Sequence, residues 1–247
     1  MYEVNEELDV KIAVDIGPQK KRAVVVDNFY KNPDEVRQLC LDSKKITPED
    51  DPGMISSLPG NRVFIETEEV AEKLEKVFFM LCFDPDLWER PFDVEFFHSE
   101  WDKSGFMCNL INDSTLLRNP NGIIPHQDSY PSHINNLRAQ FGAVIYLNTP
   151  EECAGGTNLY SFNGQMTLPD RGRTGIPKPE NEDEMSQEDL FNHINDNLKD
   201  SPEWTIEHKF EMVYNRLVLY EADVLHGQNV DLGMFTEYDR INQIFFM

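Results

Sequence analysis

The chain has 247 residues, enough for one large domain with a full core. Its formal net charge of −23 argues against a nucleic-acid backbone or an anionic membrane surface as partner, because both would repel it. The amino-terminal segment lacks the basic start and apolar run of a signal peptide, and no stretch reaches the roughly 18 apolar residues of a membrane helix. Together with four cysteines that lie far apart, these features predict a cytoplasmic protein with free thiols.

The pattern of the first part of the chain predicts one strand and two helices, which would pack against the main domain and support it. A strand is expected over residues 23–26, where four apolar residues precede a polar turn. A helix should follow, with Asn32 as its N-cap and Pro33 at its first position. A second helix is expected after Thr67, because apolar residues recur at helical spacing over 70–81.

From residue 92 onward the pattern changes to short runs rich in β-branched and aromatic residues, separated by Gly, Asn, Pro and Asp. The expected strands are PFDVEFFHSEW, FMCNLI, GIIPHQD, QFGAVIYLN, TNLYSF, WTIEHKFEMV, NRLVLY, DVLHGQ and RINQIFF. Such a series, preceded by helices, predicts a mainly β (α+β) jelly roll with helices packed outside. We therefore expect a single domain over 1–247, with 1–91 as support and 92–247 as core.

One segment, at about 164–201, interrupts the strand pattern. It is rich in Gly and Pro and then carries the acidic run PENEDEMSQED. Ser186 is expected to cap a short helix within it. The apolar face of that helix would consist of Leu190, Phe191, Ile194 and Leu198. A segment this long between two strands predicts an insertion, placed where it could cover the mouth of the barrel.

The run PHQD at 125–128, followed about a hundred residues later by His226, carries the most chemistry. Two histidines and one carboxylate can bind iron on one face and leave the opposite face open. Alternation along an expected strand places His126 and Asp128 on the same side, and a distant strand supplies His226. The tripeptide alone is a weak signal, since six His and 45 acidic residues give about one such match by chance. A second match, HSE at 98–100, lies on a strand face that is otherwise apolar.

Two interpretations of these histidines stay open at this point. The first is the open iron site made by His126, Asp128 and His226. The second is a closed zinc site that adds His133 as a fourth ligand.

Residues 126–246 resemble the double-stranded β-helix of the 2-oxoglutarate- and Fe(II)-dependent dioxygenases, and in particular the prolyl-4-hydroxylase-like branch. The resemblance is carried by HQD, AVIYLN, AGGTNLYSF, LHGQ and RINQIFF, which occur in the order typical of that branch. The closing RINQIFF is also similar to uncharacterised oxygenases of phages and marine bacteria. The resemblance covers about half of the chain.

This resemblance implies roles for five residues. His126, Asp128 and His226 match the iron ligands. Arg240 matches the basic residue that pairs with the distal carboxylate of 2-oxoglutarate, and a guanidinium suits that role because it offers two parallel N–H groups. Tyr146 matches a tyrosine whose hydroxyl bonds the same carboxylate.

The chain also departs from the branch. Leu116 and Ile123 occupy positions where the branch often has a tyrosine and another aromatic residue, and the gap from His226 to Arg240 is longer than usual. The cofactor is therefore less firmly implied than the metal.

The expected activity is hydroxylation of an unactivated C–H bond with O2 and 2-oxoglutarate, releasing succinate and CO2. The substrate would be a peptidyl or free amino acid or a small metabolite, and the oligomeric state is left open. Two alternatives come from other classes: a jelly-roll binding protein without turnover, and a metal-dependent cupin-like enzyme that uses no 2-oxoglutarate.

Overall fold

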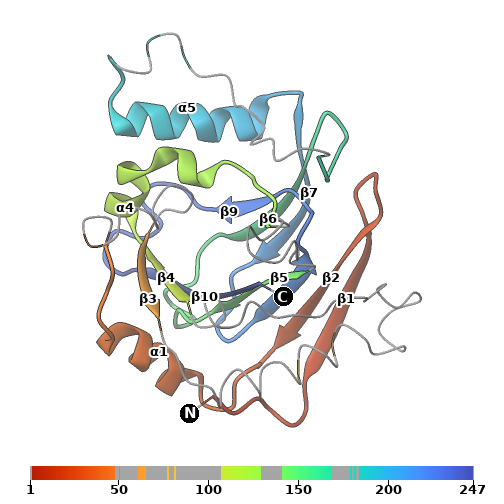
Figure 1. Ribbon diagram of the computed structural model, residues 1–247, viewed down its shortest axis with the longest axis vertical. Helices are drawn as coiled ribbons and strands as arrows, with labels where there is room; N and C mark the ends of the chain where they lie inside the picture. The colour runs from red at the N-terminus through yellow and green to blue at the C-terminus, as the bar shows by residue number, and fades with distance from the viewer. Residues whose placement is uncertain are drawn as a thin grey trace.

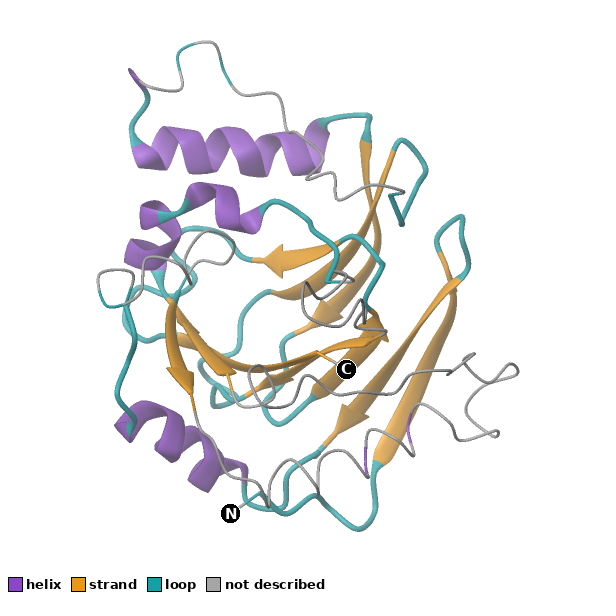
Figure 2. Cartoon of the chain, viewed as in Figure 1, coloured by secondary structure: helices purple, strands orange, loops and turns teal. Residues whose placement is uncertain are grey.

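Two antiparallel β-sheets make up most of the structure, and a few helices pack outside them (Figure 1, Figure 2). The computed structural model describes residues 2–47, 50, 60–64, 77, 81, 107–128, 141–168, 179, 181 and 184–246. This arrangement confirms the predicted mainly β architecture. Within these described residues, no helix is long and apolar enough to cross a membrane.

Antiparallel pairing organises each of the two sheets. The larger sheet contains, in spatial order, β1 (Asp9–Ile16), β2 (Lys21–Asp27), β8 (Leu217–Glu221), β5 (Phe141–Tyr146), β10 (Arg240–Phe246), β4 (Met107–Ile111) and β3 (Asn61–Phe64). The smaller sheet contains β7 (Trp204–Glu211), β6 (Gly156–Phe162) and β9 (His226–Asn229). Because β1, β2 and β3 belong to residues 1–91, the amino-terminal segment is part of the larger sheet and not a separate layer outside it.

Alternation along the strands of the larger sheet separates two buried layers. The residues that face the smaller sheet include Val144, Tyr146, Val218 and Tyr220, which belong to the inner apolar cluster. Their neighbours in sequence, including Ala143, Ile145, Leu217 and Leu219, belong to the outer cluster. On β10 the same alternation directs Arg240, Asn242 and Ile244 toward a cavity between the sheets.

The outer face of the larger sheet is covered by α1 (Pro33–Asp42), at the lower left of Figure 1. The helix begins after Asn32 with Pro33 at its first position, as predicted, although the Asn32 side chain makes no capping hydrogen bond. It buries Val36 and Cys40 against the sheet. The three described cysteines are free thiols.

The helix predicted inside the insertion is present as α5 (Gln187–Asp200). Ser186 caps it by accepting a hydrogen bond from the backbone N–H of Asp189. Its buried residues are the predicted Leu190, Phe191, Ile194 and Leu198. The helix packs against β7 and against η2 (Pro120–Ile123), the 3-10 turn that leads into His126 (Figure 1). None of the described insertion residues lines the cavity, so a cover over the barrel mouth stays a prediction.

Two predicted strands are shorter than expected. In the run 122–128 the first residues complete η2, and only His126 forms a β-bridge. Pro125 lacks the N–H that a strand contributes to its ladder, which accounts for the loss of regular pairing there. In DVLHGQ, β9 starts only at His226 because residues 222–224 form a turn.

Several other predictions fall on residues outside the described part of the chain. They include the strand over 92–101 with its HSE match, and His133. The helix predicted after Thr67 is described only at Val77 and Leu81, and both are helical.

Asp27, at the end of β2, forms a two-point contact with Arg216 beside β8. The Nε–Oδ1 and Nη2–Oδ2 distances are 2.5 and 3.0 Å, and Lys11 Nζ adds a contact of 2.8 Å. Hydrogen bonding to Arg216 outweighs burial and, with Lys11, lowers the pKa of Asp27 from 3.8 to about 2. Because the folded-state pKa is depressed, this stabilisation is present above about pH 4 and is lost as the pH falls toward about 2.

We therefore expect Asp27→Asn to lower the free energy of unfolding by about 1–2 kcal/mol at neutral pH, after allowance for solvent screening. The difference from the unchanged protein should disappear near pH 2, where Asp27 is half protonated or more. Chemical denaturation at both pH values measures this. Asp9→Asn is the control, because that carboxylate is 61% exposed. An Asp27→Asn effect of equal size at both pH values would contradict the assignment.

Candidate metal centre

The structure brings His126, Asp128 and His226 together. Each offers one ligand atom, and these atoms all lie within 4.8 Å of one another. His226 Nε2 lies 3.1 Å from Asp128 Oδ2, and His126 Nε2 lies 3.6 Å from Asp128 Oδ1. Among the described residues, no second group of three or more His, Cys, Asp or Glu residues meets the same criterion. Two imidazoles and a carboxylate that converge in this way suit a divalent transition metal.

Backbone pairing fixes the relative position of the ligands. The N–H of His126 donates to the His226 carbonyl and the N–H of His226 donates to the His126 carbonyl, both at 2.9 Å. Two residues further on, the N–H of Asp128 donates to the Ala222 carbonyl at 2.8 Å. The ligands therefore lie on two antiparallel segments that three backbone hydrogen bonds hold together. His126 and Asp128 converge even though they are not part of a regular strand.

The orientation of the His226 ring is also fixed. Its Nδ1 lies 2.9 Å from the Val224 carbonyl and donates to it, which leaves Nε2 directed at Asp128 and available to bind a metal. The side chains of His226 and Asp128 are each 6% exposed, whereas that of His126 is 19% exposed. The open side of the site is therefore the His126 side.

Opposite charges compensate the burial of Asp128. Burial by itself would raise the pKa of Asp128, but His226, His126 and a hydrogen bond from Tyr220 outweigh it, and the pKa is lowered. Burial would likewise lower the pKa of His226, but Asp128 outweighs it and the pKa is raised. The carboxylate thus stays ionised, as a metal ligand must be, while the imidazoles have to release their protons before they can bind a cation.

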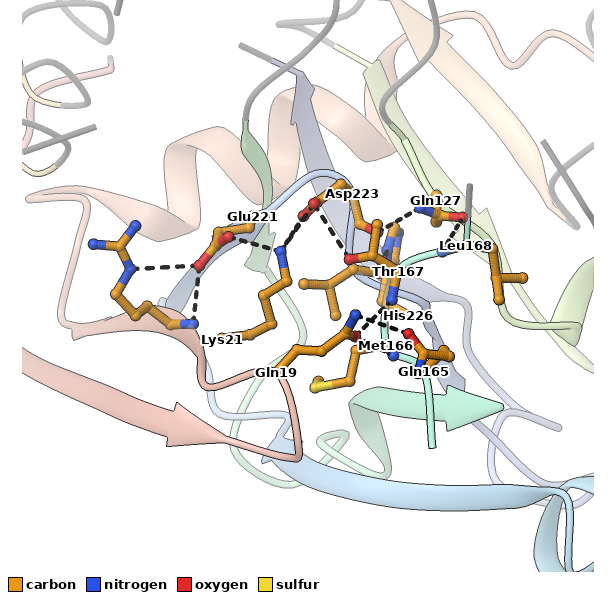
Figure 3. Close-up of polar contacts among 12 residues, drawn as sticks. Gln19, Lys21, Gln127, Gln165, Met166, Thr167, Leu168, Glu221, Asp223 and His226 are labelled. Carbon is orange, nitrogen blue, oxygen red and sulfur yellow. Dashed lines mark hydrogen bonds and ion pairs between the residues drawn. The ribbon is translucent and has the colours of Figure 1, made fainter. Parts of the chain in front are cut away.

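The turn at residues 222–225, which leads into His226, is tied to three other segments (Figure 3). Asp223 accepts hydrogen bonds from Lys21 Nζ at 2.8 Å and from Thr167 Oγ1 at 3.2 Å. Gln127, between the two ligands of the HQD run, donates to the Asp223 carbonyl at 2.6 Å. The turn is therefore held to β2, to the start of the insertion and to the HQD segment.

A cavity runs from the three ligands into the space between the sheets and encloses about 450 Å³, solvent at its mouth included. Its wall consists of Asn109, His126, Asp128, Val144, Thr157, Tyr220, His226, Gly227, Gln228, Arg240, Asn242 and Ile244. Gln228 lies two residues after His226 on β9, and Arg240 Nη1 is 3.4 Å from its Oε1. The Arg240 guanidinium therefore lies beside a residue about 7 Å along β9 from His226.

Arg240 is a buried cation that has no counter-charge among the described residues. It is 1% exposed, and its Nη atoms donate to the Asn242 side chain at 2.7 Å and to the Gly156 carbonyl at 3.2 Å. Its Nε has no hydrogen-bond partner, and among the described residues no carboxylate lies within ion-pair distance. Since burying an unpaired charge is costly, this arrangement suits an anionic ligand that supplies the missing charge.

Tyr146 lies behind Arg240 and does not reach the cavity directly. Its ring centroid is 5.6 Å from the Arg240 guanidinium carbon, and its hydroxyl is 2.7 Å from Thr157 Oγ1. Thr157 is part of the cavity wall. Thr157 therefore places a hydroxyl in the cavity wall, and a contact of the Tyr146 hydroxyl with a bound carboxylate stays a prediction.

Several wall residues were missed by the sequence analysis. Thr157, Gln228 and Asn242 surround Arg240, and Tyr220 contacts Asp128. Strand alternation could have identified Asn242, because it lies two residues after Arg240 and shares its face. Gly227, another wall residue, lies in β9. A Cβ there would lie 3.3 Å from the Ile123 carbonyl oxygen, so close packing is what favours glycine.

The two residues that stand where the family pattern has aromatic residues lie in the protein core. Leu116 and Ile123 are buried in the inner apolar cluster and line no part of the cavity. They pack in the same cluster as the buried face of α5.

Comparisons with known proteins place the chain in a family without an assigned activity. The model of the family described as "Family of unknown function (DUF6445)" matches residues 9–240, so the chain belongs to this family. A search of curated proteins found no match.

Two solved structures are similar at low identity. One is a putative alpha-ketoglutarate dependent 2,4-D dioxygenase from Burkholderia xenovorans, with 13% identity, a TM-score of 0.29, and 56% of this chain and 72% of that chain covered. The other is an N-substituted L-amino acid dioxygenase from Burkholderia ambifaria AMMD, with 12% identity, a TM-score of 0.33, and 90% and 80% covered. At these values the likeness does not say what this chain binds or catalyses.

Proposed function

We propose that this protein is an Fe(II)- and 2-oxoglutarate-dependent oxygenase that hydroxylates an unactivated C–H bond and releases succinate and CO2. One observation carries the proposal. A single cavity has a two-histidine, one-carboxylate cluster and, beside the residue two positions along β9 from His226, a buried arginine with no counter-charge among the described residues. A dicarboxylate that also binds a metal fits both ends of such a cavity.

The donor set favours iron in an open site over a closed structural zinc site. Structural zinc is bound by four protein ligands, commonly rich in cysteine. Among the described residues, the cluster of His126, Asp128 and His226 provides three, and none of the described cysteines belongs to it; His133, the fourth ligand of the zinc alternative, lies outside these residues. His126, Asp128 and His226 would hold the metal. When bound, the metal would supply activation of O2, coupled to oxidative decarboxylation of the 2-oxo acid.

Arg240 favours a 2-oxo dicarboxylate over a cupin-like site that uses none. Its guanidinium can donate two parallel hydrogen bonds to a carboxylate, and both partners are then shielded from water. The groups that hold it, Gln228, Asn242 and the Gly156 carbonyl, are neutral, so they orient the guanidinium without cancelling its charge. Thr157 adds a hydroxyl in the cavity wall.

Within these oxygenases we propose that the protein belongs to the prolyl-4-hydroxylase-like branch, because the motifs from HQD to RINQIFF occur in the order typical of that branch. The proposed substrate is a peptidyl or free amino acid or a small metabolite. Nucleic acid and membranes are not proposed as partners, because the net charge of −23 opposes both.

The test is formation of succinate from 2-oxoglutarate by the purified protein, supplied with Fe(II) and O2, against pools of peptides, free amino acids and small metabolites. We expect a pool to raise succinate formation above the level without substrate, and expect none in anaerobic samples. His126→Ala should abolish the product, and His208→Ala, a half-buried histidine of β7 outside the cavity, should not. Absence of succinate under all conditions would count against the proposal.

A further inference from the structure

Tyr220 on β8 connects the two sheets at the metal ligands. It is 5% exposed and forms part of the cavity wall. Its ring centroid lies 4.5 Å from that of His226, and burial together with the nearby Asp128 carboxylate raises the pKa of its hydroxyl. It therefore packs on one ligand through its ring and lies close to the carboxylate of another.

A glycine on the adjacent strand makes room for this contact. Gly142 on β5 is paired with Tyr220 on β8. A Cβ at Gly142 would lie 2.7 Å from Tyr220 Cε2 and 2.9 Å from Asp128 Oδ2. Any larger residue at this position would push the tyrosine and the carboxylate away from their present places. The contact between them thus depends on a residue from a third segment.

The hydrogen bonds of Asp128 must change when a metal is bound. Its oxygens lie 3.1 and 3.6 Å from the two imidazole Nε2 atoms. Those nitrogens are the metal-binding atoms, so they cannot donate to Asp128 once they bind a cation. A buried carboxylate oxygen that does not bind the metal then needs another donor. Tyr220 is the side chain already in place to be that donor.

We infer that Tyr220 is a positioning residue that holds one oxygen of Asp128 by a hydrogen bond. It thereby restricts the carboxylate to one metal-binding oxygen. This inference rests on the proposed iron site. With two imidazoles, a carboxylate bound through one oxygen leaves about three of six octahedral positions open. A carboxylate bound through both oxygens leaves about two. Tyr220 thereby preserves room for a chelating 2-oxo acid and O2 together.

The number of open positions can be counted with Mn(II) in place of iron. Mn(II) shortens the relaxation time of water protons in proportion to the number of exchangeable waters bound to it. At saturating Mn(II) without 2-oxoglutarate, we expect about three waters in the unchanged protein. Tyr220→Phe should lose about one third of this enhancement, because the released carboxylate can bind through both oxygens.

Tyr30→Phe is the matched control. Tyr30 is 1% exposed, and its hydroxyl donates to Gln243 Oε1 at 2.7 Å in the outer layer, away from the cavity. Both variants lose one buried hydroxyl, so both should lower the melting temperature without metal. Only Tyr220→Phe should change the water count. Gly142→Ala serves as a second variant, because it keeps the hydroxyl but crowds it away from Asp128, and it should show the same loss.

The outcomes separate this inference from the proposed function. If the unchanged protein binds no Mn(II), the metal site itself is wrong, and both the role of Tyr220 and the proposed function are contradicted. If Mn(II) binds and Tyr220→Phe keeps the full water count, or if the unchanged protein shows about two waters, the role of Tyr220 is overturned while the proposed oxygenase stands. A loss confined to Tyr220→Phe and Gly142→Ala supports the inference.

Discussion

Asp128→Asn is expected to weaken Fe(II) binding by at least about 100-fold. A metal held by four protein ligands is bound with a free energy of about 10–16 kcal/mol, which corresponds to about 3 kcal/mol for each ligand. The neutral amide of Asn also removes the negative charge next to the cation. Asp128 is the acidic member of the cluster and is 7% exposed, so described carboxylates elsewhere in the chain cannot replace it without rearrangement. Anaerobic calorimetry with Fe(II) measures the change.

Asp231→Asn is the control for this substitution. Asp231 is partly buried as well, but it pairs with Lys199 on α5 and has no contact with the cavity. Its replacement should leave Fe(II) affinity unchanged. Equal affinity in Asp128→Asn and in the unchanged protein would mean that the metal, if any, binds elsewhere.

Arg240→Met is expected to weaken 2-oxoglutarate binding by at least about 30-fold. Removing one member of a buried, hydrogen-bonded charge pair costs about 2–5 kcal/mol of binding free energy, and about 1.4 kcal/mol corresponds to a factor of ten. The same substitution should not lower the melting temperature of the ligand-free protein, because it replaces an unpaired buried cation with an apolar chain of similar length. Calorimetry in the presence of Mn(II) and thermal denaturation measure the two effects.

Arg216→Met gives the opposite pattern and serves as the control. Arg216 is paired with Asp27, so its loss should lower the melting temperature. It is not part of the cavity wall, so 2-oxoglutarate affinity should stay the same. If Arg240→Met kept its affinity, Arg240 would have no part in the site, and the case for a dicarboxylate would be lost.

Local patterns in the sequence account for much of this fold. The strands β5 and β10 lie within the predicted runs QFGAVIYLN and RINQIFF, and β6 begins one residue before the predicted TNLYSF, because apolar alternation and flanking turn residues are local signals. The start of α1, and the cap and buried face of α5, follow from the same kind of signal. By contrast, β1 and β3 were not predicted, since short or partly exposed strands depend on their neighbours in the sheet.

Contacts set by sheet register could not be derived in this way. His126 and His226 were proposed to meet because of their residue types, but the reciprocal hydrogen bonds that join them are long-range. The pairing of Gly142 with Tyr220, and their joint contact with Asp128, bring three separate segments together. No local pattern encodes a register of this kind. Tyr220 was therefore missed, although its strand was predicted.

The central claim is that one cavity binds iron and 2-oxoglutarate side by side. The most direct measurement is the visible absorption spectrum of the protein without oxygen, first with Fe(II) and then with 2-oxoglutarate added. We predict a weak charge-transfer band that appears only when both are present, is lost in His126→Ala, and needs far more 2-oxoglutarate in Arg240→Met. Metal binding without such a band at any 2-oxoglutarate concentration would contradict the account.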